Sequence, residues 1–112
     1  MSQIFRSGLL DGQVTIITGG GTGIGAYIAA ELGRLGATVV IASRKQDRIE
    51  AAAGKLSELL GREVLGLACD IRDRDSTAAL TAAVLEKYGR IDTLINNGGG
   101  QFMSPAELIS PR

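Results

Sequence analysis

The chain has 112 residues, 45% of them hydrophobic, and its 12 Lys and Arg balance 12 Asp and Glu. This length allows one domain with its own core, and the evenly spread charge lacks the clustered cations that binding to nucleic acid or an anionic membrane requires, so we expect neither partner. Histidine is absent and Cys69 is the single cysteine, which excludes an internal disulfide and a zinc site built from these residue types, so no metal ligands are predicted.

The first predicted elements are a strand and a helix. The segment from Gln13 to Thr18 is rich in Val, Ile and Thr, which predicts a strand buried on both faces. A helical period begins at Gly23 and stops at Gly36, and it predicts one apolar stripe facing the core. This stripe consists of Ile24, Tyr27, Ile28, Leu32 and Leu35.

A second strand and a second helix follow directly. The segment from Thr38 to Ala42 repeats the strand signature. Ser43 and Gln46 have the spacing of a capping box, which predicts the start of a helix there, and Gly61 predicts its end. The apolar residues expected on the buried face of this helix are Ile49, Leu56, Leu59 and Leu60.

The last predicted elements are a strand, a helix and a strand. Glu63 to Ala68 forms the third strand, Asp73 opens the third helix and Gly89 closes it. The helix is expected to bury Leu80, Val84 and Tyr88 on one face. Ile91 to Asn96 supplies the fourth strand, whose Ile91, Leu94 and Ile95 need apolar cover on both sides.

Strands that alternate with helices require right-handed crossovers, so the pattern predicts an α/β fold with a doubly wound parallel sheet. With strand order 3-2-1-4, the sheet reverses between the first and fourth strands. Ligands of such folds bind beyond the carboxyl ends of the strands at this point. Two clusters of glycines, at positions 19 to 25 and 98 to 100, follow these two strands and are expected to converge there.

The first cluster reads T-G-G-G-T-G-I-G from Thr18 to Gly25. Gly19 can adopt the positive φ of a tight turn, Gly23 lets backbone N–H groups approach a pyrophosphate, and Gly25 allows close packing of helix on sheet. The helix N-terminus then attracts the phosphates. A glycine-rich connector without a ligand is the alternative. The expected cofactor-binding residues here are Gly19, Gly21, Thr22, Gly23, Ile24 and Gly25.

The end of the second strand predicts which dinucleotide binds. An NAD site usually has an acidic residue there, whereas this chain reads A-S-R-K from Ala42 to Lys45. Arg44 can bind a 2′-phosphate with its guanidinium, Lys45 adds a charge and Ser43 a hydroxyl, so NADP(H) is favoured as cofactor. The alternative is a solvated first helical turn that Ser43 caps.

Two further segments are expected at the same site. Asp70 follows the third strand, where it can accept the amino group of adenine while Ile71 lines the ring; alternatively, Asp70 only starts the turn before the third helix. The segment I-N-N-G-G-G-Q-F starts at Ile95, and its asparagines can bond backbone groups while its glycines pass close to ribose and nicotinamide. The candidate residues of this segment are Asn97, Gly98 and Gly99.

Together these motifs resemble the short-chain dehydrogenase/reductase family. T-G-x-x-x-G-I-G, the Asp70-Ile71 pair and N-N-x-G at Asn96 to Gly99 occur in the family's order and spacing over residues 9 to 108, with Gly98 in place of the family's Ala. The resemblance implies a Rossmann-type fold. N-N-G-G-G-Q-F, S-P-A-E (Ser104 to Glu107) and A-S-R-K are most similar to the peroxisomal trans-2-enoyl-CoA reductase branch, which reduces enoyl-CoA thioesters with NADPH. Terpenoid alcohol dehydrogenases share much of this, so an alcohol or carbonyl dehydrogenase is the alternative.

The family's catalytic Ser and Tyr-x-x-x-Lys have no counterpart among these residues, because Tyr27 is followed by Glu31 and Tyr88 by Asp92 at the required spacing. We therefore expect residues 1–112 to be the amino-terminal, dinucleotide-binding half of a single domain, inactive by itself. A non-catalytic NADP(H)-binding module or a truncated product is the alternative. For the full-length protein we expect a small-molecule acyl-CoA or carbonyl substrate, a homo-oligomer and a cytoplasmic location, with the peroxisome as alternative.

Overall fold

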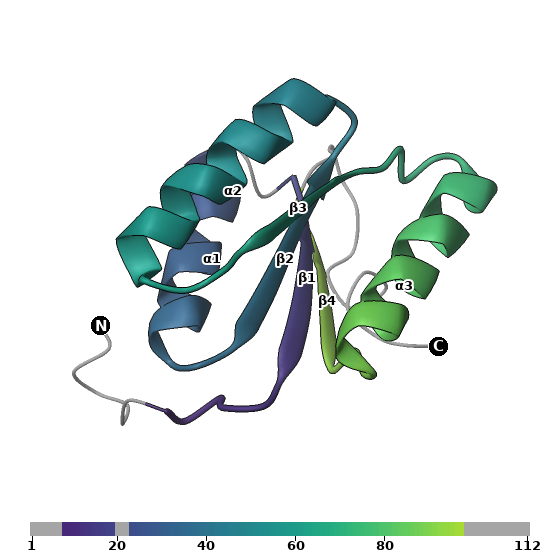
Figure 1. The fold of residues 1–112 in the computed structure, drawn as a ribbon. Helices are drawn as coiled ribbons and strands as arrows, with labels where there is room; N and C mark the ends of the chain where they lie inside the picture. The colour runs from purple at the N-terminus through teal and green to yellow at the C-terminus, as the bar shows by residue number, and fades with distance from the viewer. Residues whose placement is uncertain (1–7, 20–22, 98–112) are drawn as a thin grey trace.

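The computed structural model describes residues 8–19 and 23–97, and within them four strands alternate with three helices (Figure 1). The strands form one parallel sheet in the order β3-β2-β1-β4, which confirms the doubly wound topology. The third and fourth strands begin two residues later than the sequence predicted. The elements are β1 (Val14–Thr18), α1 (Gly23–Arg34), β2 (Thr38–Ser43), α2 (Gln46–Leu60), β3 (Leu65–Ala68), α3 (Arg74–Tyr88) and β4 (Thr93–Asn96).

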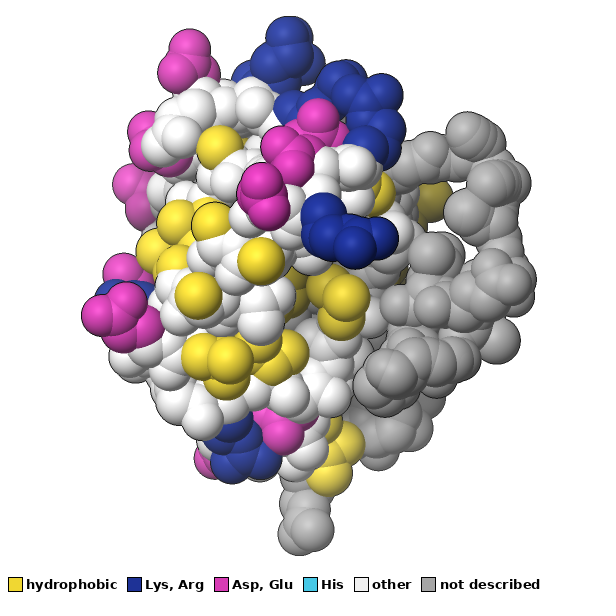
Figure 2. Space-filling model, turned by 90° about the vertical axis from the view of Figure 1, so that its right-hand side faces the viewer, with side chains coloured by type: hydrophobic (Ala, Val, Ile, Leu, Met, Phe, Trp, Pro, Cys, Tyr) yellow, Lys and Arg dark blue, Asp and Glu magenta, His cyan; other side chains and the backbone are white. Residues whose placement is uncertain are grey.

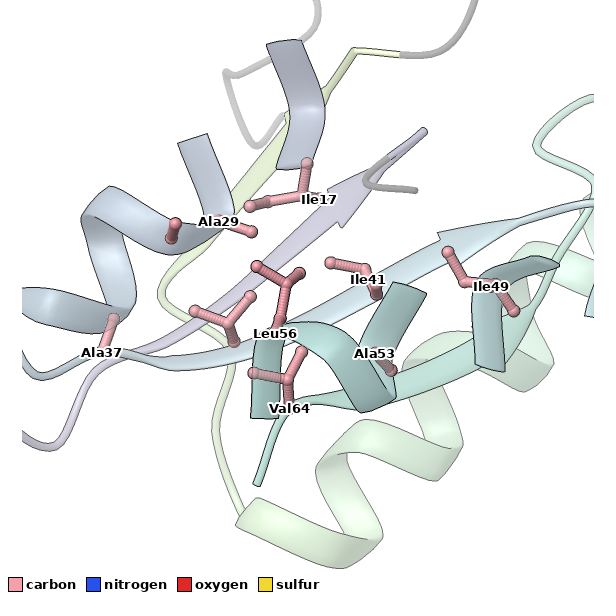
Figure 3. Packing of buried hydrophobic residues seen from close by; sticks show 10 residues of the cluster. Ile17, Ala29, Ala37, Ile41, Ile49, Ala53, Leu56 and Val64 are labelled. Atoms are coloured by element: carbon pink, nitrogen blue, oxygen red, sulfur yellow. The ribbon is translucent and has the colours of Figure 1, made fainter. Parts of the chain in front are cut away.

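Helices α1 and α2 cover one face of the sheet and α3 covers the other (Figure 1). Neighbouring side chains of β2 show why the strand sequence lacks polar alternation: Ile41 packs in the cluster under α1 and α2, whereas Val40 packs in the cluster under α3. Every residue of β1 is buried as well. Figure 3 shows how Ile17 and Ile41 from the sheet meet Leu56 from α2. The two inner strands are therefore buried on both faces, as expected for a parallel sheet.

The prediction for the buried face of α1 was wrong for Ile24 and Tyr27. Ile24 is 70% exposed and Tyr27 is 61% exposed. The helix instead buries its small residues in the cluster that it shares with the sheet and α2, because residues without bulky side chains let the helix backbone lie close to its neighbours. Ile28 and Leu32 lie at the margin of this contact and are half-buried. The buried residues of α1 are Gly25, Ala29, Ala30 and Gly33.

The predicted capping box before α2 was also wrong. Ser43 is the last residue of β2, where it pairs with Ala68, and Lys45 occupies the N-cap position without a side-chain hydrogen bond to the helix. The side chain of Gln46 bonds Glu50 instead. Because the ladder between β2 and β3 extends one residue further than expected, Ser43 is held in the strand and cannot cap.

At the other end of α2, Gly61 adopts the left-handed conformation and caps the helix as predicted, but the prediction that Leu59 is buried was wrong. The buried positions Ile49, Ala53 and Leu56 define the face of α2 that meets the sheet, and Leu59 lies off this face. In α3, Asp73 caps the N-terminus by accepting a hydrogen bond from the Asp75 N–H, and Leu80 and Val84 are buried as predicted.

The start of β4 is fixed to β1 by Asp92. Its carboxylate Oδ2 accepts a 2.7 Å hydrogen bond from the Val14 N–H, and its own N–H donates to the Val14 carbonyl at 2.8 Å. Arg90 donates to both carboxylate oxygens, at 2.9 and 2.7 Å. The bonds from Arg90, together with the one from Val14, hold the pKa of Asp92 below its usual value. Asp92 therefore ties the amino ends of two strands together in its ionised form.

We predict that Asp92→Asn lowers the melting temperature at neutral pH, because the ionised carboxylate is stabilised in the folded state. A carboxyl group with a lowered folded pKa stabilises the fold above its unfolded pKa, near 3.9, and this contribution is lost as the pH falls through the folded pKa. The gap between wild type and variant should close below about pH 4. Thermal melts from pH 7 to pH 3 measure it, with the exposed Glu58→Gln as control. A gap that stays constant over this range would contradict the prediction.

Candidate functional site

The carboxyl ends of all four strands meet at one edge of the sheet. Thr18 lies in register with Ala42 of β2 on one side and with Asn96 of β4 on the other. The ladder continues past the strands, since the Gly19 N–H donates to the Ala42 carbonyl at 2.6 Å and the Asn97 N–H to the Thr18 carbonyl at 3.1 Å. On the other side of β2, the Cys69 N–H donates to the Ser43 carbonyl at 2.7 Å. The four connections that follow these strands therefore start in one row.

Side chains link the connections after β1 and β4. The buried Thr18 hydroxyl donates to Oδ1 of Asn96 at 2.9 Å, and Nδ2 of Asn97 donates to the Gly19 carbonyl at 3.3 Å. Asn97 thus bonds a backbone group as expected, whereas Asn96 bonds a side chain. The two segments begin side by side, as the sequence predicted. Residues 20–22 and 98–100 lie outside the described residues, and they include the candidates Gly21, Thr22, Gly98 and Gly99.

The N-terminus of α1 opens at this edge. Gly19 has a φ of 73°, which is the left-handed turn conformation predicted for it, and Gly25 is buried. A Cβ atom added to Gly23 would meet no atom of the other described residues within 4 Å. Ile24 projects from the same turn and is exposed. The first N–H groups of a helix have no partner within the helix, so the start of α1 fits an anionic group such as a diphosphate.

Two cations stand at the start of α2. Arg44 and Lys45 are exposed, and neither side chain forms a hydrogen bond or ion pair with another described residue. The hydroxyl of the half-buried Ser43 has no hydrogen-bond partner among the described residues either. Cations at a helix N-terminus are opposed by the helix dipole. These three residues therefore fit a phosphate group. Arg44 can donate two parallel hydrogen bonds, Lys45 adds a positive charge, and Ser43 can donate from its hydroxyl.

Asp70 lies between this pair and α3. Its Oδ1 accepts a 3.0 Å hydrogen bond from the Arg72 N–H and a 3.2 Å bond from Arg72 Nε. The backbone bond, followed by the guanidinium bond, holds the pKa of Asp70 below its usual value, and the charge of Arg44 acts in the same direction. The alternative that Asp70 starts the turn before the third helix is thus confirmed for its Oδ1 atom. Arg72 was missed in the sequence, although its position two residues after Asp70 is the spacing of an Asx turn.

Ile71 borders an apolar hollow of about 310 Å³ between α3 and β4, which is also lined by Leu80, Ile91 and Leu94. Leu94 is 41% exposed, whereas Ile91 and Ile95 are half-buried. Apolar side chains accordingly reach the surface in the middle of the face that carries α3 (Figure 2). The sequence indicated that the apolar residues of the fourth strand need cover on both sides, and Leu94 is left partly uncovered.

Residues 8–19 and 23–97 contain no group of three or more Cys, Asp or Glu arranged to hold a metal ion. No helix in this part of the chain has the length and apolar character needed to cross a bilayer.

Comparison with known proteins gives consistent results. A family model described as short chain dehydrogenase matches residues 13–112. A curated relative, peroxisomal 2,4-dienoyl-CoA reductase [(3E)-enoyl-CoA-producing] of Danio rerio, is 44% identical over 109 residues, which cover 97% of this chain and 36% of the relative. The chain therefore spans little more than a third of that relative's length.

Solved structures show the same fold. Citronellol catabolism dehydrogenase (AtuB) of Pseudomonas aeruginosa PAO1 matches with a TM-score of 0.80 and 47% identity, over 88% of this chain and 41% of that one. L-Sorbose reductase of Gluconobacter frateurii, complexed with NADPH and L-sorbose, matches with a TM-score of 0.78 and 35% identity, over 85% and 36%. An NAD+-bound xylitol dehydrogenase matches with a TM-score of 0.76 and 28% identity, over 82% and 35%. The chain belongs to the short-chain dehydrogenase family of oxidoreductases.

Proposed function

We propose that residues 1–112 form the amino-terminal, NADP(H)-binding half of an oxidoreductase domain. The observation that carries this proposal is that Arg44 and Lys45, which form no hydrogen bond or ion pair with another described residue, lie on the same sheet edge as the N-terminus of α1. The start of α1 and the start of α2 then provide two anion-binding positions, one for the diphosphate and one for the 2′-phosphate of NADP(H). Relatives differ in cofactor, since one neighbour holds NADPH and another NAD+.

The residues have distinct tasks in this proposal. The first turn of α1 binds the diphosphate, and Ser43, Arg44 and Lys45 bind the 2′-phosphate. Asp70 and Ile71 hold the adenine. The connection after β4, which contains Asn97, Gly98 and Gly99, passes beside the ribose and nicotinamide. The cofactor supplies the hydride, and the chain binds and orients it.

We propose an unsaturated acyl-CoA thioester as substrate of the whole protein. The Danio rerio relative is named as a 2,4-dienoyl-CoA reductase that produces (3E)-enoyl-CoA, not as the trans-2-enoyl-CoA reductase that the motifs resembled. Both substrates are CoA thioesters with a double bond conjugated to the carbonyl, and reduction adds one hydride and one proton. The same relative's name places it in the peroxisome, which favours that location over the cytoplasm. We further propose that the full-length protein is a homo-oligomer.

A turnover assay tests the substrate class. The full-length protein is mixed with NADPH and either 2,4-hexadienoyl-CoA or trans-2-hexenoyl-CoA, and the loss of NADPH absorbance is followed. We expect oxidation of NADPH with one or both thioesters and none with residues 1–112 alone, since these lack the Tyr-x-x-x-Lys of the family. Binding of NADPH without turnover of either thioester would contradict the proposed substrate.

An alcohol or carbonyl dehydrogenase is the second candidate, and the 47% identity to the citronellol catabolism dehydrogenase favours it. The same assay with citronellol and NADP+ distinguishes the two, because an alcohol dehydrogenase reduces NADP+ with citronellol and leaves both thioesters unchanged. NADPH binding without turnover of any of these substrates indicates a non-catalytic NADP(H)-binding module.

A further inference from the structure

The backbone of Asp70 is fixed on both sides by α3. Its N–H donates to the Ser76 hydroxyl at 3.0 Å, and its carbonyl accepts from the Asp73 N–H at 2.9 Å. The residue before it, Cys69, is buried and donates its N–H to Ser43, the neighbour of Arg44. Because these bonds leave the backbone little freedom, the direction of the Asp70 carboxylate depends mainly on rotation about its own side-chain bonds.

Arg72 restricts that rotation. Its backbone N–H and its guanidinium Nε both bond the same oxygen, Oδ1, at 3.0 and 3.2 Å. The other oxygen, Oδ2, has no hydrogen-bond partner among the described residues, and the Asp70 side chain is 37% exposed. The terminal torsion of an Asp side chain is broad when nothing fixes it, so anchoring one oxygen sets the direction of the other. An ionised carboxylate is purely an acceptor, and Oδ2 is therefore oriented to receive a donor.

We propose that Arg72 is a positioning residue, which holds Asp70 by Oδ1 and presents Oδ2 to the exocyclic amino group of adenine in the bound cofactor. This inference rests on the proposed function, because it takes the Asp70 end of the site to be the adenine end. The guanidinium does not touch the cofactor in this arrangement. Loss of Arg72 should therefore reduce recognition of the amino group while leaving the diphosphate and 2′-phosphate contacts in place.

The test compares NADPH with deamino-NADPH, in which an oxygen replaces the 6-amino group of adenine. We expect wild type to bind NADPH about tenfold more tightly, the effect of one hydrogen bond to a charged group. In Arg72→Ala the backbone N–H still bonds Oδ1, but the guanidinium bond is lost and a single donor holds the carboxylate. Because Oδ2 is then less firmly oriented, this selectivity should fall to about threefold or less. Fluorescence titration of both dinucleotides measures the ratio. The matched control is Arg74→Ala, which removes the same charge from an exposed position two residues away.

The outcomes separate the two proposals. If wild type binds neither dinucleotide, the proposed function fails. If it binds both with equal affinity, Asp70 does not read the amino group and the positioning role fails, while the cofactor proposal stands. Selectivity that survives in Arg72→Ala, or that Arg74→Ala lowers equally, overturns the role of Arg72 alone. Should Arg72→Ala fail to fold in a thermal melt, Arg72→Gln takes its place with the same expected loss.

Discussion

Replacing Arg44 with Asp is expected to weaken binding of NADPH by about 100-fold and to leave binding of NADH unchanged or slightly tighter. The guanidinium supplies a charge-assisted, forked contact to the 2′-phosphate, and a carboxylate at the same place repels that phosphate but can accept the 2′-hydroxyl of NADH. Fluorescence titration with both dinucleotides measures the change. The cofactor preference should therefore move toward NADH.

The matched control is Arg48→Asp. Arg48 is exposed on α2 near its first turn, and the substitution makes the same change in net charge. We expect it to change the ratio of NADPH to NADH affinity by less than about threefold, because the general field of one exposed charge is screened by salt. Equal affinities for NADPH and NADH in wild type, unchanged in Arg44→Asp, would rule out the 2′-phosphate site.

The order of the strands could be predicted because it follows from general rules. Alternating strands and helices with right-handed crossovers admit few sheets, and the β-branched runs at Val14–Thr18 and Thr38–Ala42 indicate inner strands buried on both faces. Glycines at Gly61 and Gly89 end helices because both adopt left-handed conformations, which glycine tolerates best. These features depend on local sequence, and the structure confirms them.

The buried face of α1 could not be predicted from periodicity. Ile24 and Tyr27 form a stripe with helical spacing, yet the helix buries small residues instead. Ala29 packs in the cluster with strand residues, and Gly33 lies against Leu60 of α2. A helical period of large apolar side chains indicates the buried face of most surface helices, whereas a helix that lies close to its sheet must contact it through small residues. Which face of the helix is buried depends on the distance between helix and sheet, and this distance is a property of the assembled fold.

The site was predicted in part for a similar reason. The row that contains Gly19, Arg44, Asp70 and Asn97 follows from topology alone, since each residue comes one or two positions after a parallel strand. The contribution of Arg72 depends on a turn geometry and a side-chain rotamer, which sequence spacing suggests but does not determine. Topology thus places the connections at one edge, and local hydrogen bonds decide how each side chain is oriented there.

Gly66→Ala is expected to destabilise the fold by about 1–3 kcal/mol, because it overpacks the contact between α2 and β3. A Cβ atom at this position would lie 2.7 Å from the Ile49 carbonyl oxygen and 2.9 Å from the Ala53 Cβ. The nearest obstacle is helix backbone, which cannot rotate away as a side chain can. The helix must shift from the sheet, and this opens the cluster in which Ile49 and Ala53 are buried (Figure 3). Urea unfolding measures the loss.

Gly54→Ala makes the same substitution within α2 itself, on the side that faces solvent, where an added Cβ atom meets no described residue within 4 Å. Alanine has the higher helix propensity, so this variant should be more stable than wild type by about 0.5–1 kcal/mol. Replacing Gly66 or Gly54 with Ala would then change the stability in opposite directions, because only one of the two positions lacks room for a side chain. At Gly66 the missing side chain permits close contact between helix and sheet, whereas at the exposed Gly54 its absence adds only backbone freedom to the unfolded chain. If both variants shift stability in the same direction, α2 does not approach β3 as closely as the structure shows.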